Sequence, residues 1–166
     1  NKLYEIKYFC FLFVILLSIL NPTPLIALEK IATVVKVQSK VYGVNREGEK
    51  RLLKLYDSIY LNEEIITDNS SSIVIQYLDN STIILKKKSS IKVTDFTLGK
   101  AKNLFLAVID KGSAIIESGK IAKDSNNSME IKLPDMSLGI RGTRFNIGQK
   151  EDGSYDVGLS EDSFGN

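Results

Sequence analysis

The 166-residue chain contains no histidine, no tryptophan and a single cysteine, Cys10. Without histidine there is no usual general base, no serine–histidine triad and no imidazole metal ligand. Cys10 lies inside an apolar N-terminal stretch, so the rest of the chain has no thiol for a disulfide, a nucleophile or a cysteine–zinc site. These absences exclude many classes of enzyme, and we expect a non-catalytic protein that needs no cofactor and no metal.

The chain also lacks an excess of charge of one sign. Its 22 Lys and Arg nearly balance its 20 Asp and Glu, which gives a formal net charge of +2. Nucleic-acid-binding domains usually show a clustered basic excess, whereas the one basic run here, residues 86–88, ends an apolar segment and is typical of a solvated strand end. The adjacent acidic pairs 63–64 and 151–152 would point to opposite faces of a strand. We therefore expect neither a nucleic-acid partner nor a carboxylate acid–base pair.

Long hydrophobic runs are rare, and the longest one lies near the N-terminus. It extends from Tyr8 to Leu20, follows two lysines and is closed by Pro22 and Pro24. The run is shorter than the roughly 20 residues of a bilayer-spanning helix and fits the core of a signal peptide, which needs about 7–15. Ala27 offers a cleavage point. We predict a secretory signal peptide over residues 1–27, with an uncleaved membrane anchor at 8–20 as the alternative.

The remaining residues, 28–166, have an ordinary length for one domain and are rich in short β-type runs. Alternating valines mark 35–41, and further β-branched or alternating runs occupy 72–78, 82–86, 91–96, 104–109, 113–118, 128–133, 143–148 and 155–159. Turn residues separate them, most clearly the Asp-Asn-Ser at 79–81. The pattern predicts a single all-β domain of about nine or ten short strands, arranged as a sandwich, a barrel or a stacked β-coil. Residues 122–130 are expected to form a polar surface loop, and the helix-permissive segments 47–57 and 99–110 to be strand or loop.

Polar loops and glycines do not form a recognisable ligand motif. The segments around 124–128 and 151–156 offer oxygen ligands, but neither has the spacing of a calcium loop. The segment "GIRGTRF" (139–145) has two glycines without the Gly-Lys-Ser/Thr of a phosphate loop.

An ordered series of motifs resembles the FecR domain family. In that family an opening strand is followed by an Asp-x-Ile-x-Thr segment, an Asp-Gly-Ser hairpin, a Leu-x-x-x-Ser step, a Gly-Ser motif, a Thr-Pro-like strand end and Arg-Gly-Thr-x-Phe. The corresponding positions here run in the same order from about residue 31 to 159: Glu64 to Thr67, Asp79-Asn80-Ser81, Leu85 with Ser89, Gly112-Ser113, Leu133-Pro134 and Arg141-Gly142-Thr143-Arg144-Phe145. Asn80 replaces the family's turn glycine, and Asn readily enters the left-handed region. Tyr56-Asp57 stands where a Gly-Asp turn is usual, so that corner is expected to be rebuilt.

The resemblance implies structural roles for the motif residues, which are Thr67, Asp79, Asn80, Ser81, Gly112, Ser113, Pro134, Arg141, Gly142, Thr143 and Phe145. It also implies a sensing, signal-relay or scaffold role in the envelope of a Gram-negative bacterium, through contacts with envelope proteins. Exposed strand edges would supply those contacts. The signal peptide places the protein in the periplasm or outside the cell.

Two alternative functions stay open. The chain could be an exported carbohydrate- or surface-binding adhesin fragment, or the periplasmic part of a membrane-anchored anti-sigma-type regulator if 8–20 is an anchor. We also expect the chain to be truncated at its C-terminus, because family members commonly continue with another strand.

Arg141 and Arg144 admit two interpretations. Gly139 and Gly142 would let the backbone turn tightly while Phe145 enters the core, and Arg141 would then satisfy carbonyls or a carboxylate at that corner. On this interpretation Arg141→Ala lowers the melting temperature by several degrees. The alternative is that both arginines contact a partner.

Overall fold

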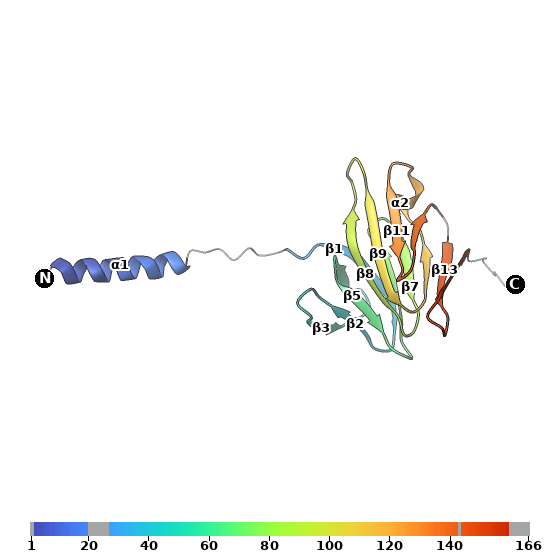
Figure 1. The fold of residues 1–166 in the computed structure, drawn as a ribbon, viewed down its shortest axis with the longest axis horizontal. Coiled ribbons are helices and arrows are strands. Elements are labelled where there is room, and N and C mark those ends of the chain that lie inside the picture. The colour runs from blue at the N-terminus through green and yellow to red at the C-terminus, as the bar shows by residue number, and fades with distance from the viewer. Residues whose placement is uncertain (1, 20–26, 143, 160–166) are drawn as a thin grey trace.

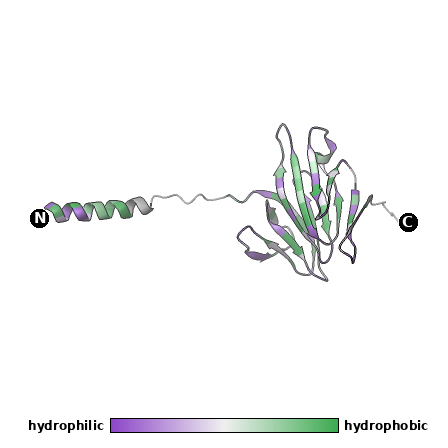
Figure 2. Ribbon diagram, viewed as in Figure 1, coloured by the Kyte–Doolittle hydropathy of each residue, from purple (hydrophilic) through white to green (hydrophobic). Residues whose placement is uncertain are grey.

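The computed structural model describes residues 2–19, 27–142 and 144–159. An N-terminal helix, α1 (Lys2–Ile19), precedes a domain of fourteen strands and one short helix, α2 (Lys120–Lys123) (Figure 1). The all-β prediction is confirmed, although the strands number more than the nine or ten expected. Hydrophobic residues dominate α1 beyond its first turns and alternate with polar ones along the strands (Figure 2). Within the described residues, no helix combines the length and hydrophobicity required to cross a membrane.

The strands form two seven-stranded sheets. The first sheet contains, in spatial order, β14 (Tyr155–Leu159), β13 (Arg144–Gln149), β10 (Ala114–Glu117), β7 (Thr82–Leu85), β6 (Ser72–Tyr77), β1 (Lys30–Gln38) and β4 (Ser58–Tyr60). The second contains β12 (Ser137–Ile140), β11 (Ser128–Lys132), β9 (Leu104–Lys111), β8 (Ser90–Thr97), β5 (Glu64–Thr67), β2 (Val41–Val44) and β3 (Lys50–Leu52). Every neighbouring pair is antiparallel except β9 and β11, which run parallel. Of the architectures left open by the sequence, this is the sandwich.

One hydrophobic core lies between the two sheets. It takes the alternate residues of each strand, such as Ile73 and Ile75 of β6 and Phe105 and Ile109 of β9. Tyr77 forms an edge contact with the Phe105 ring at a centroid distance of 4.8 Å. Because both sheets contribute to one core, each sheet depends on the other for burial of its inner face.

Three hairpins use the same three-residue loop. In each, a residue with positive φ occupies the third loop position: Gly48 (φ 82), Asn80 (φ 68) and Gly153 (φ 85). The residue just before each loop donates its N–H to the carbonyl of the residue just after the loop. Tyr77 donates in this way to Ser81 at 2.8 Å, and Lys150 to Ser154 at 2.8 Å. This geometry is a type I turn followed by a bulge residue in the left-handed region. It explains why Asn stands where the family has Gly in the 79–81 turn.

The alternating valines near the start of the domain do not form one strand, contrary to expectation. The chain turns at Ser39, which has φ 59, so Val41 belongs to β2 in the other sheet. Within β1 the register shifts between Val34 and Lys36, and Val35 is left 39% exposed. A bulge adds one residue to a strand and so reverses the faces of the residues beyond it.

At the corner where the family has Gly-Asp, Tyr56 occupies the left-handed region that favours glycine. Tyr56 adopts φ 69 and donates its N–H to the Val34 carbonyl at 2.8 Å, and Asp57 accepts the Lys54 N–H at 2.8 Å. Another difference from the sequence prediction is α2, which occupies the start of the expected loop at 122–130.

Candidate functional site

A fully buried carboxylate joins the β6–β7 hairpin to the start of α2. Asp79 accepts hydrogen bonds from the Ser81 N–H at 3.0 Å, the Ser81 hydroxyl at 2.8 Å and the Ile121 N–H at 3.3 Å. Its carbonyl accepts the Lys120 N–H at 2.8 Å. Three donors offset much of the cost of burying the charge. This cluster therefore holds two segments together and has no exposed atom to offer a ligand.

Gly119 lets those segments approach. A Cβ at this position would lie 2.2 Å from the Asp79 carbonyl oxygen and 2.3 Å from the Ser81 nitrogen. The Gly119 N–H donates instead to the Ser81 hydroxyl at 2.9 Å. Sequence analysis missed Gly119, although it lies seven residues after Gly112 of the Gly-Ser motif. Its role depends on a contact across about forty residues.

A second polar cluster brings together the predicted residues Thr67, Gly112 and Ser113. The Thr67 hydroxyl donates to the Lys86 carbonyl at 2.6 Å and accepts the Ser89 N–H at 2.9 Å. The Ser89 hydroxyl accepts the Ser113 N–H at 2.8 Å. Gly112 has φ 87, and a Cβ there would lie 2.4 Å from the Ser89 Cα. These hydrogen bonds connect three turns of the sandwich.

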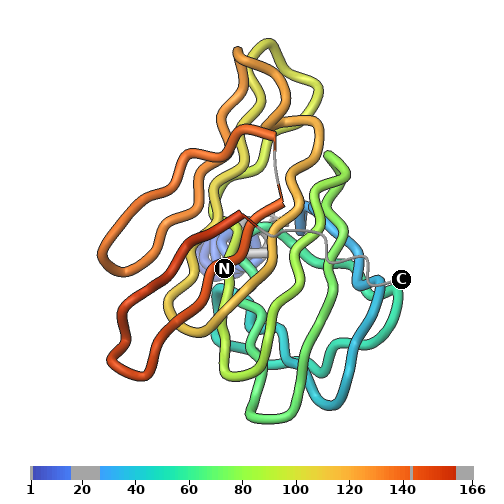
Figure 3. Tube along the Cα trace, turned by 90° about the vertical axis from the view of Figure 1, so that its right-hand side faces the viewer, coloured from blue at the N-terminus to red at the C-terminus, as the bar shows by residue number. Residues whose placement is uncertain are grey.

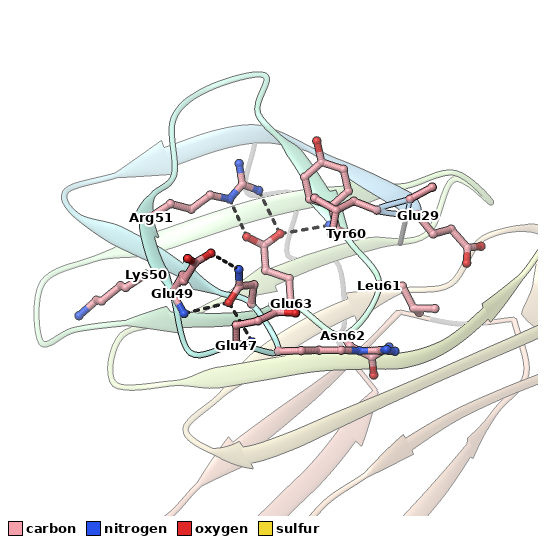
Figure 4. A pocket seen from close by; sticks show the side chains of 13 residues that line it. Glu29, Glu47, Glu49, Lys50, Arg51, Tyr60, Leu61, Asn62 and Glu63 are labelled. Carbon is pink, nitrogen blue, oxygen red and sulfur yellow. Dashed lines mark hydrogen bonds and ion pairs between the residues drawn. The ribbon is translucent and has the colours of Figure 1, made fainter. Parts of the chain in front are cut away.

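The β3–β4 side of the sandwich is closed by an ion pair. Glu63 is 5% exposed and accepts hydrogen bonds from Arg51 Nε at 2.7 Å and Nη2 at 3.0 Å, as well as from the Tyr60 N–H at 3.1 Å (Figure 4). Arg51 also donates to the Ser58 carbonyl on β4. The hydrogen bond to Glu63 raises the pKa of the Arg51 guanidinium. Since Arg51 lies on β3, it ties the edge of the second sheet to the edge of the first.

A cavity of about 690 Å³ lies beside this ion pair, between the β2–β3 hairpin and the chain entering β1. Its charged lining is mixed in sign, with Glu29, Glu47, Glu49 and Glu63 against Arg46, Lys50 and Arg51; Figure 4 shows this pocket. Asn45 and Glu49 are bonded to each other at 2.8 Å, and Lys50 lies over the Tyr42 ring. The charges therefore mostly compensate one another and indicate no particular ligand.

The opposite side of the sandwich, where β12 and β14 are the edge strands, is open. Figure 3 faces this side and shows the orange β11–β12 hairpin next to the red β13–β14 hairpin (Figure 3). A groove of about 280 Å³ runs between the two edges and is lined by Leu138, Gly139, Ile140, Arg141, Phe145, Val157, Gly158 and Leu159. Val157 is 42% and Leu159 73% exposed. We name this surface the open edge.

At one end of the open edge, Tyr155 packs against the core. Burial raises the pKa of Tyr155, and the charges of Asp110 and Asp135 raise it further. Asp110 lies on β9, and Asp135 belongs to the β11–β12 turn. The groove is exposed at the other end, toward Leu159 and Arg141.

The two arginines of "GIRGTRF" lie in different surroundings. Arg141 is exposed, lines the open edge and makes no hydrogen bond or ion pair with the described residues, 2–19, 27–142 and 144–159. The expectation that it satisfies carbonyls or a carboxylate at the corner is not supported. Arg144 is half-buried on β13, opposite Glu117 of β10, and faces away from the core side occupied by Phe145. Only Arg141 is placed to reach a molecule in the groove.

The other predicted residues of this region have simple positions. Gly142 adopts φ 64, as the tight turn requires, whereas Gly139 lies inside β12 without positive φ. Phe145 is buried in the core as expected, and Pro134 is exposed in the β11–β12 turn. Thr143 and the expected C-terminal truncation fall outside the described residues. Across the described part of the chain, no group of three or more acidic residues or cysteines is placed to hold a metal ion.

The fold and these clusters define a β-sandwich whose polar motif residues brace its turns. The FecR protein family model matches residues 63–162, more than half of the chain. The chain belongs to the FecR protein family. One solved structure, a "Cell surface anchoring domain", is 26% identical over 39% of this chain and 84% of that chain, with a TM-score of 0.37, which is too low to relate the two folds. No match was found among curated proteins.

Proposed function

We propose that this FecR-family chain is an exported, non-catalytic module that senses or relays a signal, or acts as a scaffold, through contacts with proteins of the bacterial envelope. The observation that carries the proposal is the contrast between the two sides of the sandwich. On one side Arg51, paired with Glu63, bridges the two sheets, whereas on the other a groove with an apolar lining runs between the edge strands β12 and β14. Unpaired edges invite strand pairing, and proteins usually cover them unless they serve as contact surfaces.

Export is supported by the N-terminal segment. The apolar residues of α1 follow basic residues, and the segment precedes every strand of the domain. The placement in the periplasm or outside the cell is part of the proposal.

The buried polar clusters argue for a structural use of the family motifs. The side chains of Asp79, Ser89 and Ser113 accept hydrogen bonds from backbone N–H groups within the domain. The motif residues therefore stabilise the sandwich, and the open edge remains available for a partner.

The adhesin alternative has less support. Carbohydrate sites usually present aromatic faces, but Tyr77, Phe96, Phe105 and Phe145 are all buried in the core. Tyr56, at 76% exposure, is the most exposed aromatic side chain among the described residues of the sandwich. A glycan array probed with the exported chain tests this alternative directly, and specific binding would favour it.

In-cell photocrosslinking tests the proposal. The full chain is expressed in a Gram-negative host with a photoreactive residue at Val157, on the open edge, or at Leu52, on the closed side. These positions form a matched pair, since both are edge-strand residues with exposures of 42% and 44%. We expect the chain in the envelope fraction and an envelope protein, identified by mass spectrometry, crosslinked at position 157 and not at 52. Retention in the cytosol, or equal capture at both positions, would contradict the proposal.

A further inference from the structure

The backbone of β14 offers unpaired hydrogen-bonding groups to a new strand. In antiparallel pairs, residues that bond across the ladder alternate with residues whose N–H and C=O point away. The pair Lys150 and Ser154 is bonded at 2.8 Å, and the register of β13 and β14 continues from it without interruption. The N–H and C=O groups of Tyr155 and Val157 therefore point away from β13. Among the described residues, no strand lies beyond β14 in the first sheet.

The side chains of the same residues face the interior of the sandwich. Val157 is opposite Ile147 and Leu159 is opposite Phe145, both of which are core residues. On β12 the corresponding inward side chains are Leu138, opposite Ile131, and Ile140, opposite Met129. A strand added beside β14 would thus gain backbone hydrogen bonds and would also bury alternate side chains in the groove between the sheets.

The lining of the groove specifies the charge of its occupant. Seven of the eight lining residues are apolar or glycine, and the eighth is Arg141. An arginine left beside a newly dehydrated apolar surface loses solvation unless a carboxylate pairs with it. Arg141 is exposed, so its planar fork of donors is available for such a pair.

Building on the function proposed above, we infer that the open edge binds an extended segment of a partner protein as an additional strand next to β14. The segment has apolar residues at alternate positions and a carboxylate that pairs with Arg141. Affinity comes from the backbone groups of Tyr155 and Val157 and from apolar burial, whereas Arg141 selects an acidic segment over a neutral one.

A second copy of the chain fits this surface less well. If β14 paired with β14 of another molecule, the inward side chains would be Tyr155, Val157 and Leu159. None of them carries a charge, so Arg141 of each copy would lack a counter-ion.

The closed side supplies a control for the backbone contribution. The bond from the Leu53 N–H to the Val41 carbonyl, at 2.9 Å, fixes the alternation on β3, so the N–H of Leu52 also points away from its sheet. Proline at position 157 or 52 removes an outward N–H and leaves the bonds to the neighbouring strand intact. Val157→Pro therefore tests strand addition at the open edge, and Leu52→Pro shows the effect of a proline at an edge strand elsewhere.

The probe is a capped peptide of about seven residues in which valine and threonine alternate and a glutamate lies near one end; a second peptide has glutamine instead. The full chain is expressed, the exported product is purified, and peptide binding is followed by NMR titration. We expect the glutamate peptide to bind more tightly than the glutamine peptide by about tenfold, and Arg141→Gln to abolish that difference. Val157→Pro should weaken both peptides at least tenfold, while Leu52→Pro leaves both unchanged. Melting curves confirm that each variant is folded.

Other outcomes would overturn the inference. Binding that survives Val157→Pro would exclude strand addition, and equal binding of the two peptides would exclude selection by Arg141. A dimer of the unmodified chain that Val157→Pro dissociates would make a second copy the occupant. Peptide binding seen only after Glu161→Gln and Asp162→Asn would show that the chain's own C-terminal residues compete for the groove. If no peptide binds while photocrosslinking still captures an envelope protein, the proposed function stands and this site is wrong.

Discussion

The buried carboxylate of Asp79 gives the most specific stability prediction. Asp79→Asn keeps the shape of the side chain but replaces one acceptor oxygen with an NH₂ group. That group would face either the Ile121 N–H and the Ser81 hydroxyl, which both donate to one oxygen at 3.3 and 2.8 Å, or the Ser81 N–H, which donates to the other oxygen at 3.0 Å. Hydrogen bonds to charged groups contribute about 1.5–3 kcal/mol, and an unpaired buried donor costs a similar amount. Relief of the buried charge offsets part of the loss, so we expect a net destabilisation of about 2–3 kcal/mol.

Thermal unfolding by circular dichroism measures this effect on the chain from residue 28 onward, which contains all fourteen strands. A loss of this size in a domain of this length lowers the melting temperature by about 10 °C.

Asp152 provides a control with the same local geometry. It also accepts the N–H and the hydroxyl of the serine two residues later, Ser154, but in an exposed hairpin. Those hydrogen bonds lower the pKa of Asp152, yet water can replace them. We expect Asp152→Asn to leave the melting temperature unchanged. Equal effects of the two substitutions would refute the argument that burial of Asp79 is what makes its hydrogen bonds important.

Further predictions concern glycine, tyrosine and arginine positions. Gly112→Ala should destabilise the domain by more than about 3 kcal/mol in urea unfolding, because the new Cβ would overlap Ser89. Gly48→Ala is the control, since Gly48 has a similar φ but no atom within 4 Å of the new Cβ, and it should cost only about 1 kcal/mol. Burial raises the pKa of Tyr77 well above its ordinary value of 10. The contribution of the neutral Tyr77 side chain to the free energy of unfolding is therefore complete below pH 10. Above pH 10 the tyrosine of the unfolded chain ionises, and this contribution falls by about 1.4 kcal/mol per pH unit. Tyr77→Phe should flatten the alkaline loss of stability relative to the unmodified chain. Arg141→Ala should leave the melting temperature unchanged, and a fall of several degrees would restore the corner role.

Hairpins and inward-facing residues were predictable because their signals are local. The predicted strands at 72–78, 82–86 and 155–159 correspond closely to β6, β7 and β14, and the turn at 79–81 forms as expected. Turn residues and period-two alternation act over a few positions, so no knowledge of the partner strand is required.

Several of the shortest strands were not predictable. β3, β4 and β12 contain too few residues for alternation to stand out, and Val35 lies at a bulge that only the pairing with β6 creates. Apolar residues on both faces also hid the orientation of some strands. Val74, Ile84 and Ile115 are in register across the outer face of the first sheet and remain half-buried.

The candidate surface was only partly visible in the sequence. Strand edges and Arg141 were considered, but no local signal shows that β12 and β14 end on the same side or that Arg51 reaches Glu63 across twelve residues. The glycine at position 43 is such a hidden requirement, since a Cβ there would lie 2.2 Å from the Glu63 carboxylate. These features depend on contacts between residues that are distant in the sequence, and such contacts leave no local pattern by which they can be predicted.

Amide hydrogen exchange along β14 tests the central claim most directly. In the free chain, Tyr155 and Val157 should exchange fast, while Asp156 and Gly158, whose N–H groups face β13, exchange slowly. Adding the glutamate peptide should slow exchange at Tyr155 and Val157 and leave Asp156 and Gly158 unaffected. Slow exchange at all four amides in the free chain, or no change on adding the peptide, would contradict an edge that accepts a partner strand.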